Sequence, residues 1–196
     1  MSIFDVLFGR TKPVRSRQEQ FFSIATATPT LETSEGLKAT GRGGLALRPM
    51  SNSGFREAEG EMEQLVRAGA RESISRLGFA KDDYGYLWVI VEDEQFEDMV
   101  SLLYSASVAL TDNGYGDQIL AAIVEFSQEA GKKVFWIYNF KRATFYPFVP
   151  ADGKGRDNAY ELRLAAVMKK ELPIEPEPSH WYALWGAPLD AARSGG

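Results

Sequence analysis

Seven aromatic side chains crowd into the fourteen positions from Phe135 to Phe148, and this stretch constrains the fold more than any other. Alternate residues of an extended strand point to opposite faces, so Trp136 and Tyr138 would share one face and Ile137 would take the other. Both faces are then apolar, which is typical of a strand that is covered on both sides. The stretch therefore predicts the core of a sheet with a cover on each face.

Short turns bound the aromatic stretch, at residues 129–132 and 141–143. Parallel pairing needs a connection of about a dozen residues or more, so these turns predict antiparallel hairpins. With the helical periodicity elsewhere, they predict an α+β fold: an antiparallel sheet of hairpins with helices packed on it, loosely similar to the secretion-chaperone-like fold. We expect strands at residues 29–33, 44–49, 72–79, 86–91, 118–126, 133–140 and 144–149, and helices at residues 1–9, 17–25, 55–70, 96–110 and 158–172.

Local signals refine these elements. Asp93 is expected to cap the helix that follows it, and Asn158 with Glu161 forms a capping box. The glycine-rich run 40–44 lacks the Gly-x-x-x-x-Gly-Lys-Ser/Thr spacing of a phosphate loop, so we interpret it as a mobile hairpin turn. Residues 187–196 are expected to be frayed.

The domain organisation expected for the 196 residues is simple. Residues 1–16 form an amphipathic and basic segment, residues 17–172 form a single α+β domain, and residues 173–196 form a proline-rich connector with an aromatic tail. The connector is expected to be semi-rigid and polyproline-like.

Composition excludes several classes of protein. A net charge of −5 disfavours nucleic acid as a partner, because phosphate binding needs a basic face. Without cysteine there is no disulfide, thiolate nucleophile or cysteine-ligated zinc. No apolar run approaches the ~20 residues that span a bilayer, and the N-terminus does not have the order of a secretory signal. We expect a cytoplasmic protein, with a peripheral position at the inner face of the membrane as a refinement.

The N-terminal segment is the sharpest functional feature of the sequence. At ~100° per residue its large apolar side chains fall on one side of a helix, and basic residues follow directly. A short apolar helix followed by cations suits an anionic membrane surface, a partner helix or the chain's own domain, and the sequence does not separate these three. The residues expected to bind are Ile3, Phe4, Leu7, Phe8, Arg10 and Lys12.

Two further groups are candidates for recognition. Lys141, Arg142 and Arg156 lie near turns, where they would form a small cationic rim for an anion or an acidic partner. Trp181 and Trp185 are four residues apart, so one helical turn would present both to the same groove as an aromatic anchor. Docking of this anchor on its own domain is favoured over binding a partner, because the proline connector limits its reach.

Catalytic chemistry has little support. His180 is the single histidine, and packing or capping explains it better than a triad or a metal site. The acidic run at 92–98 is typical of a helix N-terminus, where carboxylates complement the helix dipole. Its members are Glu92, Asp93, Glu94, Glu97 and Asp98. We expect no metal, no cofactor and no catalytic residue.

Six stretches spread in order over the chain carry a family resemblance. They are IFDVLFGRTK (3–12), YGYLWVIVED (84–93), YNFKRATFYPF (138–148), RDNAYELRL (156–164), LPIEP (172–176) and WYALWGAP (181–188). The chain resembles the PspAB family of proteins associated with phage shock protein A (PspA). The resemblance implies an accessory role in the envelope-stress response, with a PspA-like coiled-coil protein as partner and with no catalytic motif.

The leading hypothesis is therefore a non-enzymatic accessory protein of the PspA-type membrane-stress response that acts by protein binding, with the membrane surface as a second contact. The alternative is a domain that senses a small anion or metabolite beside Arg142 and Arg156. A third reading is a carboxylate-dependent hydrolase that uses Glu92, Asp93 and Glu97. The sequence leaves the oligomeric state open.

Overall fold

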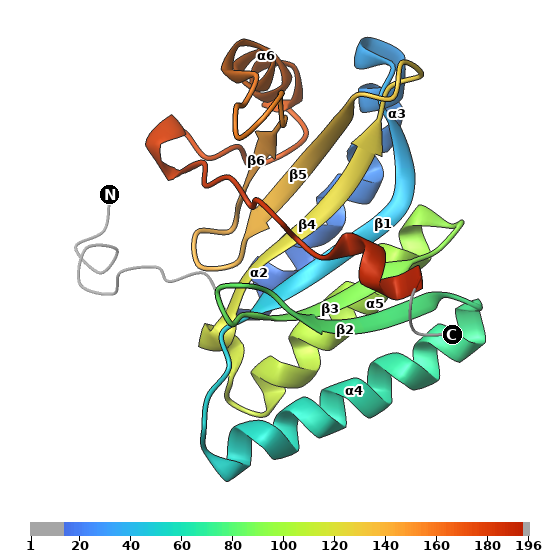
Figure 1. Cartoon of the computed structure of the whole chain (residues 1–196), viewed down its shortest axis with the longest axis vertical. Helices are drawn as coiled ribbons and strands as arrows, with labels where there is room; N and C mark the ends of the chain where they lie inside the picture. The colour runs from blue at the N-terminus through green and yellow to red at the C-terminus, as the bar shows by residue number, and fades with distance from the viewer. Residues whose placement is uncertain (1–13, 194–196) are drawn as a thin grey trace, which may run out of the picture.

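The computed structural model describes residues 14–193, which contain a six-stranded antiparallel sheet (Figure 1). The strands lie in the order β2-β3-β1-β4-β5-β6, so the predicted α+β fold with an antiparallel sheet is confirmed. The strands are β1 (Lys38–Leu47), β2 (Arg76–Lys81), β3 (Leu87–Glu92), β4 (Ile119–Ser127), β5 (Lys133–Asn139) and β6 (Thr144–Phe148).

Helices cover one face of the sheet. In Figure 1, α2, α3 and α5 lie behind the sheet and α4 runs along its lower side. The helices are α2 (Val14–Glu19), α3 (Ser23–Glu35), α4 (Ser53–Ser73), α5 (Phe96–Asp112) and α6 (Asn158–Met168), with short 3-10 turns η1 (Gln20–Phe22), η2 (Gly116–Gln118), η3 (Pro178–His180) and η4 (Leu189–Arg193). Within residues 14–193, none of the helices combines the length and the apolar character needed to cross a bilayer.

The aromatic stretch lies at the centre of both cores. Trp136 and Tyr138 are fully buried among the helices, and Ile137 is fully buried on the opposite face. The alternation predicted from the sequence is therefore confirmed. The face packed by α2 to α6 is called the helix face below, and the opposite one is the strap face.

Among residues 14–193, one irregular segment crosses the strap face. Residues 173–193, called the strap, cross the near side of the sheet in Figure 1 as the red trace. Trp181, Leu189 and Ala192 bury their side chains against strands there. At its start, the strap adds to the edge of β6: Glu175 N donates to Phe145 O at 2.8 Å. Helices thus cover one face of the sheet, and the strap crosses the other and leaves part of it open.

The strand predicted at residues 29–33 is wrong, because α3 runs through it with Pro29 inside the helix. Ile24, Ala27 and Leu31 follow helical spacing and are fully buried on the helix face. Their packing offsets the backbone hydrogen bond that Pro29 removes. Tertiary packing therefore decides a segment whose local signals favoured a strand.

The hairpin turn predicted at residues 40–44 is also wrong, because β1 continues through this glycine-rich run, with an irregularity in its pairing to β4 between Ala39 and Gly43. Gly41 has φ of 73°, and a Cβ there would lie 1.8 Å from the backbone oxygen of Asp93. A Cβ on Gly43 would meet Met99 Sδ at 2.6 Å, and one on Gly44 would meet Leu189 at 3.1 Å. These glycines serve close packing on both faces of the strand rather than flexibility.

Several predicted boundaries and caps shift. The helix expected to end at residue 70 continues to Ser73, so β2 begins at Arg76 rather than within residues 72–75. Asp157 caps α6 by accepting from Tyr160 N, which corrects the predicted cap at Asn158. Asp93 is not the N-cap of α5, which is Gln95. Its carboxylate instead accepts from Gln95 N at 2.7 Å in the turn before the helix.

The C-terminal expectations are corrected as well. Residues 187–193 are not frayed, because Leu189 and Ala192 are buried and η4 rests on β2 and β3. Trp181 and Trp185 do not share a helical turn, since the chain between them has no helical structure. They nevertheless pack on one face of the sheet, on Tyr146 and Phe148 respectively.

Candidate functional site

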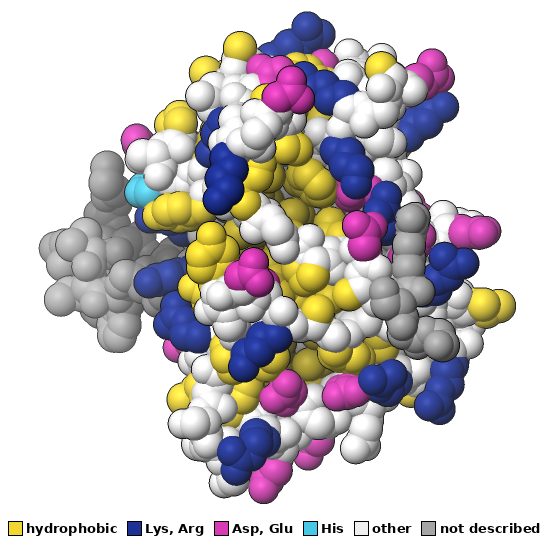
Figure 2. Space-filling model, in the orientation of Figure 1, with side chains coloured by type: hydrophobic (Ala, Val, Ile, Leu, Met, Phe, Trp, Pro, Cys, Tyr) yellow, Lys and Arg dark blue, Asp and Glu magenta, His cyan; other side chains and the backbone are white. Residues whose placement is uncertain are grey.

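A large open cleft lies on the strap face, with a volume of about 1050 Å³. Its walls come from the end of β1, the β2–β3 turn with the start of β3, the start of β4, the end of β5 and the strap. Figure 2 shows hydrophobic side chains gathered in the hollow along the middle of this face. A cleft of this size is at the upper end of the ~300–1,000 Å³ that small-molecule sites occupy.

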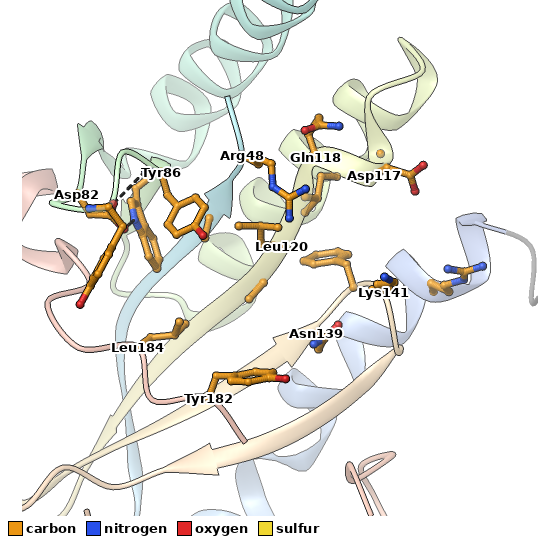
Figure 3. A pocket seen from close by; sticks show the side chains of 18 of the residues that line it. Arg48, Asp82, Tyr86, Asp117, Gln118, Leu120, Asn139, Lys141, Tyr182 and Leu184 are labelled. Carbon is orange, nitrogen blue, oxygen red and sulfur yellow. Dashed lines mark hydrogen bonds between the residues drawn. The ribbon is translucent and has the colours of Figure 1, made fainter. Parts of the chain in front are cut away.

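The interior of the cleft is apolar. Leu120 lies in the middle of the close-up in Figure 3, with Tyr86 on one side and Leu184 and Tyr182 of the strap on another. Phe140 also lines the cavity and is mostly buried. These side chains belong to segments far apart in the sequence, which the sheet order brings together.

Two exposed tyrosines flank the mouth of the cleft. Tyr84 belongs to the turn between β2 and β3 and is 76% exposed, and Tyr182 belongs to the strap and is 58% exposed. Aromatic residues are enriched among the anchors of protein interfaces, because they combine a large apolar area with a polar group. The mouth therefore presents anchor side chains from two different walls.

Asp82 fixes the turn that carries Tyr84. Its Oδ1 accepts from the backbone nitrogens of Tyr84 and Tyr86, both at 2.9 Å, and its Oδ2 accepts from Trp88 Nε1 at 2.9 Å. A carboxylate with three such bonds holds one turn and one indole in a defined position. The wall of the cleft on this side is consequently rigid, and Asp82 is occupied in holding it.

Cationic side chains also line the cleft. Arg48 and Lys141 are exposed, and neither forms an ion pair with another described residue. Figure 3 shows both on the side of the cleft that lies away from Leu184. The acidic Asp117 lies at the rim and is exposed.

The predicted cationic rim is not a single unit. Arg156 pairs with the buried Glu161 at 2.8 Å and donates to Trp181 O at 2.7 Å, so it anchors the strap. Arg142 lies 3.9 Å from Glu175. Lys141 alone of the three predicted residues lines the cleft.

Glu175 gathers a second set of contacts that fix the strap. Its carboxylate accepts from Thr144 at 3.0 Å and lies 3.1 Å from His180 Nδ1. Burial opposes ionisation, but hydrogen bonds from His180, Thr144 and the Glu177 backbone lower the pKa of Glu175 overall. The histidine thus has a structural contact, as the sequence favoured.

The strap tryptophans dock on their own domain. Trp181 is buried, stacks on Tyr146 at 6.5 Å and donates from Nε1 to Glu175 O at 3.0 Å. Trp185 meets Phe148 edge-on at 4.8 Å and lines the cleft. Burial raises the pKa of the Tyr146 phenol, whose partner is the backbone of the strap. Trp181 therefore fixes the strap to the sheet, whereas Trp185 forms part of the wall of the cleft.

The acidic run at 92–98 is divided among separate contacts. Asp93 is buried and accepts from Ser75 and from Gln95 N. Glu92 lies 3.8 Å from Arg76, and Glu97 is exposed on the first turn of α5. Glu94 is likewise exposed, and Asp98 is half-buried. None of these carboxylates lines the cleft. Among the described residues, no three histidine or acidic side chains gather in a group that would hold a metal ion.

The strongest sequence prediction, the N-terminal binding segment from Ile3 to Lys12, lies outside the described residues. Sequence reasoning missed Tyr84, Arg48 and Leu120, which line the cleft. The turn residues Asp82-Asp83 beside Tyr84 were the one available signal. Nothing local marks Arg48 or Leu120, because their meeting depends on the pairing of β1 with β4.

Comparison with protein families matches residues 1–189 to the model described as "PspAB: PspA associated protein B". The match covers nearly the whole chain, in agreement with the six stretches that carry the resemblance. Comparison with curated proteins and with solved structures gives no significant match, so the similarity to the secretion-chaperone-like fold stays a prediction.

Proposed function

Since the chain belongs to the PspAB family, whose name indicates association with PspA, we propose that it is a non-enzymatic accessory protein that binds a PspA-like coiled-coil partner at the mouth of the strap-face cleft. The binding serves the PspA-type membrane-stress response. A helix is the natural occupant of the mouth, because an amphipathic helix lays its apolar side chains into a hydrophobic groove.

The observation that carries the proposal is the pair of exposed tyrosines beside an apolar cleft. Tyr84 comes from the turn between β2 and β3 and Tyr182 from the strap, and both line the cleft together with Leu120 and Leu184. Exposed large apolar side chains around a hollow mark interaction sites on soluble proteins. Partner contacts here would be strongest at the two exposed tyrosines.

The carboxylates that would serve catalysis support a non-enzymatic role. Asp93 is occupied by Ser75 and Gln95, and Glu92 lies beside Arg76. In the cleft, Asp82 is taken up by its own turn and by Trp88. Each of these three carboxylates is therefore engaged in a contact that holds a turn or a strand end in place.

Affinity measurement with the purified PspA-like partner tests the proposal. Replacing both tyrosines, Tyr84→Ala with Tyr182→Ala, is expected to weaken binding by at least about 30-fold, the ~2 kcal/mol that one central interface aromatic contributes. Leu65→Ala is the matched control, since Leu65 is a 50% exposed apolar side chain on α4, outside the cleft. Equal affinity for the double variant and the control would contradict the cleft as the binding surface.

Contact with the membrane is a separate part of the proposal. The apolar residues of the N-terminal segment and the cations after them support binding to anionic lipid. Flotation with anionic vesicles is expected for the wild type and not for Phe4→Asp with Phe8→Asp. Failure of the wild type to float would remove the membrane contact while leaving partner binding at the cleft intact.

A further inference from the structure

The interior of the cleft has more cationic character than a partner's apolar side chains require. Arg48 and Lys141 line it without an ion pair to any described residue, and Arg17 lines it as well. Of the two acids in the lining, Asp82 already accepts three hydrogen bonds from its own turn and Trp88. Asp117 is the remaining acid and lies at the rim. Three cationic side chains against two acidic ones give the lining a formal charge of +1.

The apolar floor adjoins these cations directly. Leu120, Phe140 and Leu184 line the same cavity as Arg48 and Lys141. In Figure 3 the two cations lie on one side and Leu184 lies on the other, so polarity changes along the cleft. With a volume of about 1050 Å³, the cleft is far larger than a bare inorganic anion needs.

We propose that the interior of the cleft binds an anionic amphiphile, in which one extended apolar chain lies along Leu120 and Leu184 and the anionic head group meets Arg48 and Lys141. Burial of the chain drives binding, and charge-assisted hydrogen bonds orient the head group. This goes beyond the proposed function, because it assigns a small ligand to the interior and leaves the two tyrosines at the mouth to the partner.

Dodecanoate below its micellar concentration is the probe, with binding followed by calorimetry and by the fluorescence of Trp88 and Trp185, which both line the cleft. Saturable binding of one molecule is expected. Each methylene added between decanoate and dodecanoate should tighten binding by up to about fourfold, as burial of one CH₂ predicts. No saturable binding at 1 mM (roughly the weakest affinity a specific site would show) overturns the proposal.

Matched variants separate the two ends of the ligand. Arg48→Gln and Lys141→Gln should each weaken dodecanoate binding by about tenfold, the typical loss of one charge-assisted hydrogen bond. Lys170→Gln is the control, because Lys170 is an exposed lysine just after α6 and does not line the cleft. Leu120→Trp fills the cavity and should abolish binding, with circular dichroism confirming an unchanged fold. Equal affinity for the control and both charge variants contradicts the head-group assignment.

Three other probes decide the class of ligand. Dodecanol should bind at least about tenfold more weakly than dodecanoate, and equal affinity overturns the anionic assignment. Inorganic phosphate binding as tightly as dodecyl phosphate would show a free-anion site and overturn the amphiphile. Binding to phosphatidylglycerol vesicles without any binding of monomeric dodecanoate would show a surface contact alone and would also overturn the proposal. These measurements need no partner protein, so they succeed or fail independently of the proposed function.

Discussion

The two faces of the sheet are closed in different ways. On the helix face, five α-helices and the strands share one continuous core that includes Phe126, Trp136 and Tyr138. On the strap face, one irregular segment covers a smaller core that includes Trp88 and Ile123, and the large cleft lies beside it. We expect the functional site on the strap face, because binding sites are often formed by the less stable parts of a structure.

The strap is fixed mainly at two places, one on either side of the cleft wall. At one end, Glu175 N bonds to Phe145 O at 2.8 Å, and Trp181 is held by Arg156. At the other end, Asp190 pairs with Arg42 at 2.9 Å. The wall residues between these two places are supported chiefly by side-chain packing, as Trp185 on Phe148 illustrates. We therefore expect the strap to tolerate local change better than the helix face does.

The largest effect is expected on the helix face. Phe126 is fully buried and meets Phe96 edge-on at 5.5 Å. Phe126→Ala should lower the free energy of unfolding by about 3–5 kcal/mol, because a buried aromatic leaves a cavity that the packed helices cannot fill. Urea denaturation measures it. A loss below about 1.5 kcal/mol, less than the transfer free energy of the side chain alone, would contradict the picture of a closely packed face.

A smaller effect is expected at the main anchor of the strap. Trp181→Ala should cost about 1–2 kcal/mol, less than a core tryptophan, because the strap can detach locally while the sheet stays folded. Hydrogen exchange should speed up in residues 181–193 and stay unchanged in α5. If unfolding by urea shows the same loss for Trp181→Ala as for Phe126→Ala, the strap belongs to the cooperative core and the two faces do not differ.

Substitutions at two neighbouring glycines of β1 allow a direct comparison of the two faces, because Gly43 faces the helices and Gly44 faces the strap. A Cβ on Gly43 would meet Met99 Sδ at 2.6 Å and Ile123 O at 3.0 Å, whereas one on Gly44 would meet Leu189 at 3.1 Å and Trp88 at 3.2 Å. Gly43→Ala should therefore destabilise the protein by about 1–3 kcal/mol through overpacking. Gly44→Ala should cost less, about 1 kcal/mol, because its contacts are 3.1 Å or longer and Leu189 belongs to the strap, which can shift outward. Thermal unfolding of both variants checks the order, and a reversed order would contradict it.

The sequence predicts most strongly where alternation and short turns are local. The strands around Trp136 and Phe145 and the helix with Leu103 and Leu110 lie where the pattern places them. The pattern fails at Pro29 and at Gly41, where distant residues decide the structure. A proline inside a helix and glycines inside a strand are tolerated only because of packing partners that no local window contains.

The candidate site follows the same division. The two strap tryptophans are visible in the sequence as an aromatic cluster, and the structure places both on the sheet. The cleft they help to form was not predictable, because Tyr84, Arg48 and Leu120 meet only through the strand order β3-β1-β4. A cleft between non-consecutive strands depends on the strand order, and a short window of sequence does not reveal that order.

The smallest expected effect is the pH dependence of the strap. The pKa of Glu175 is lowered in the folded protein, with burial opposing the shift and the hydrogen bonds from His180, Thr144 and Glu177 N exceeding it. A carboxyl group with a lowered pKa contributes stability that is present above its unfolded pKa of ~4.3 and is lost as the pH falls toward the folded value. Hydrogen exchange of residues 181–193 should therefore show less protection, relative to α5, below about pH 4.3. Glu175→Gln should remove this dependence by exposing the strap equally at neutral and acid pH. A wild-type strap whose protection relative to α5 does not change down to about pH 3, well below the ordinary glutamate range, would show that its anchoring relies on the tryptophan and not on this carboxylate.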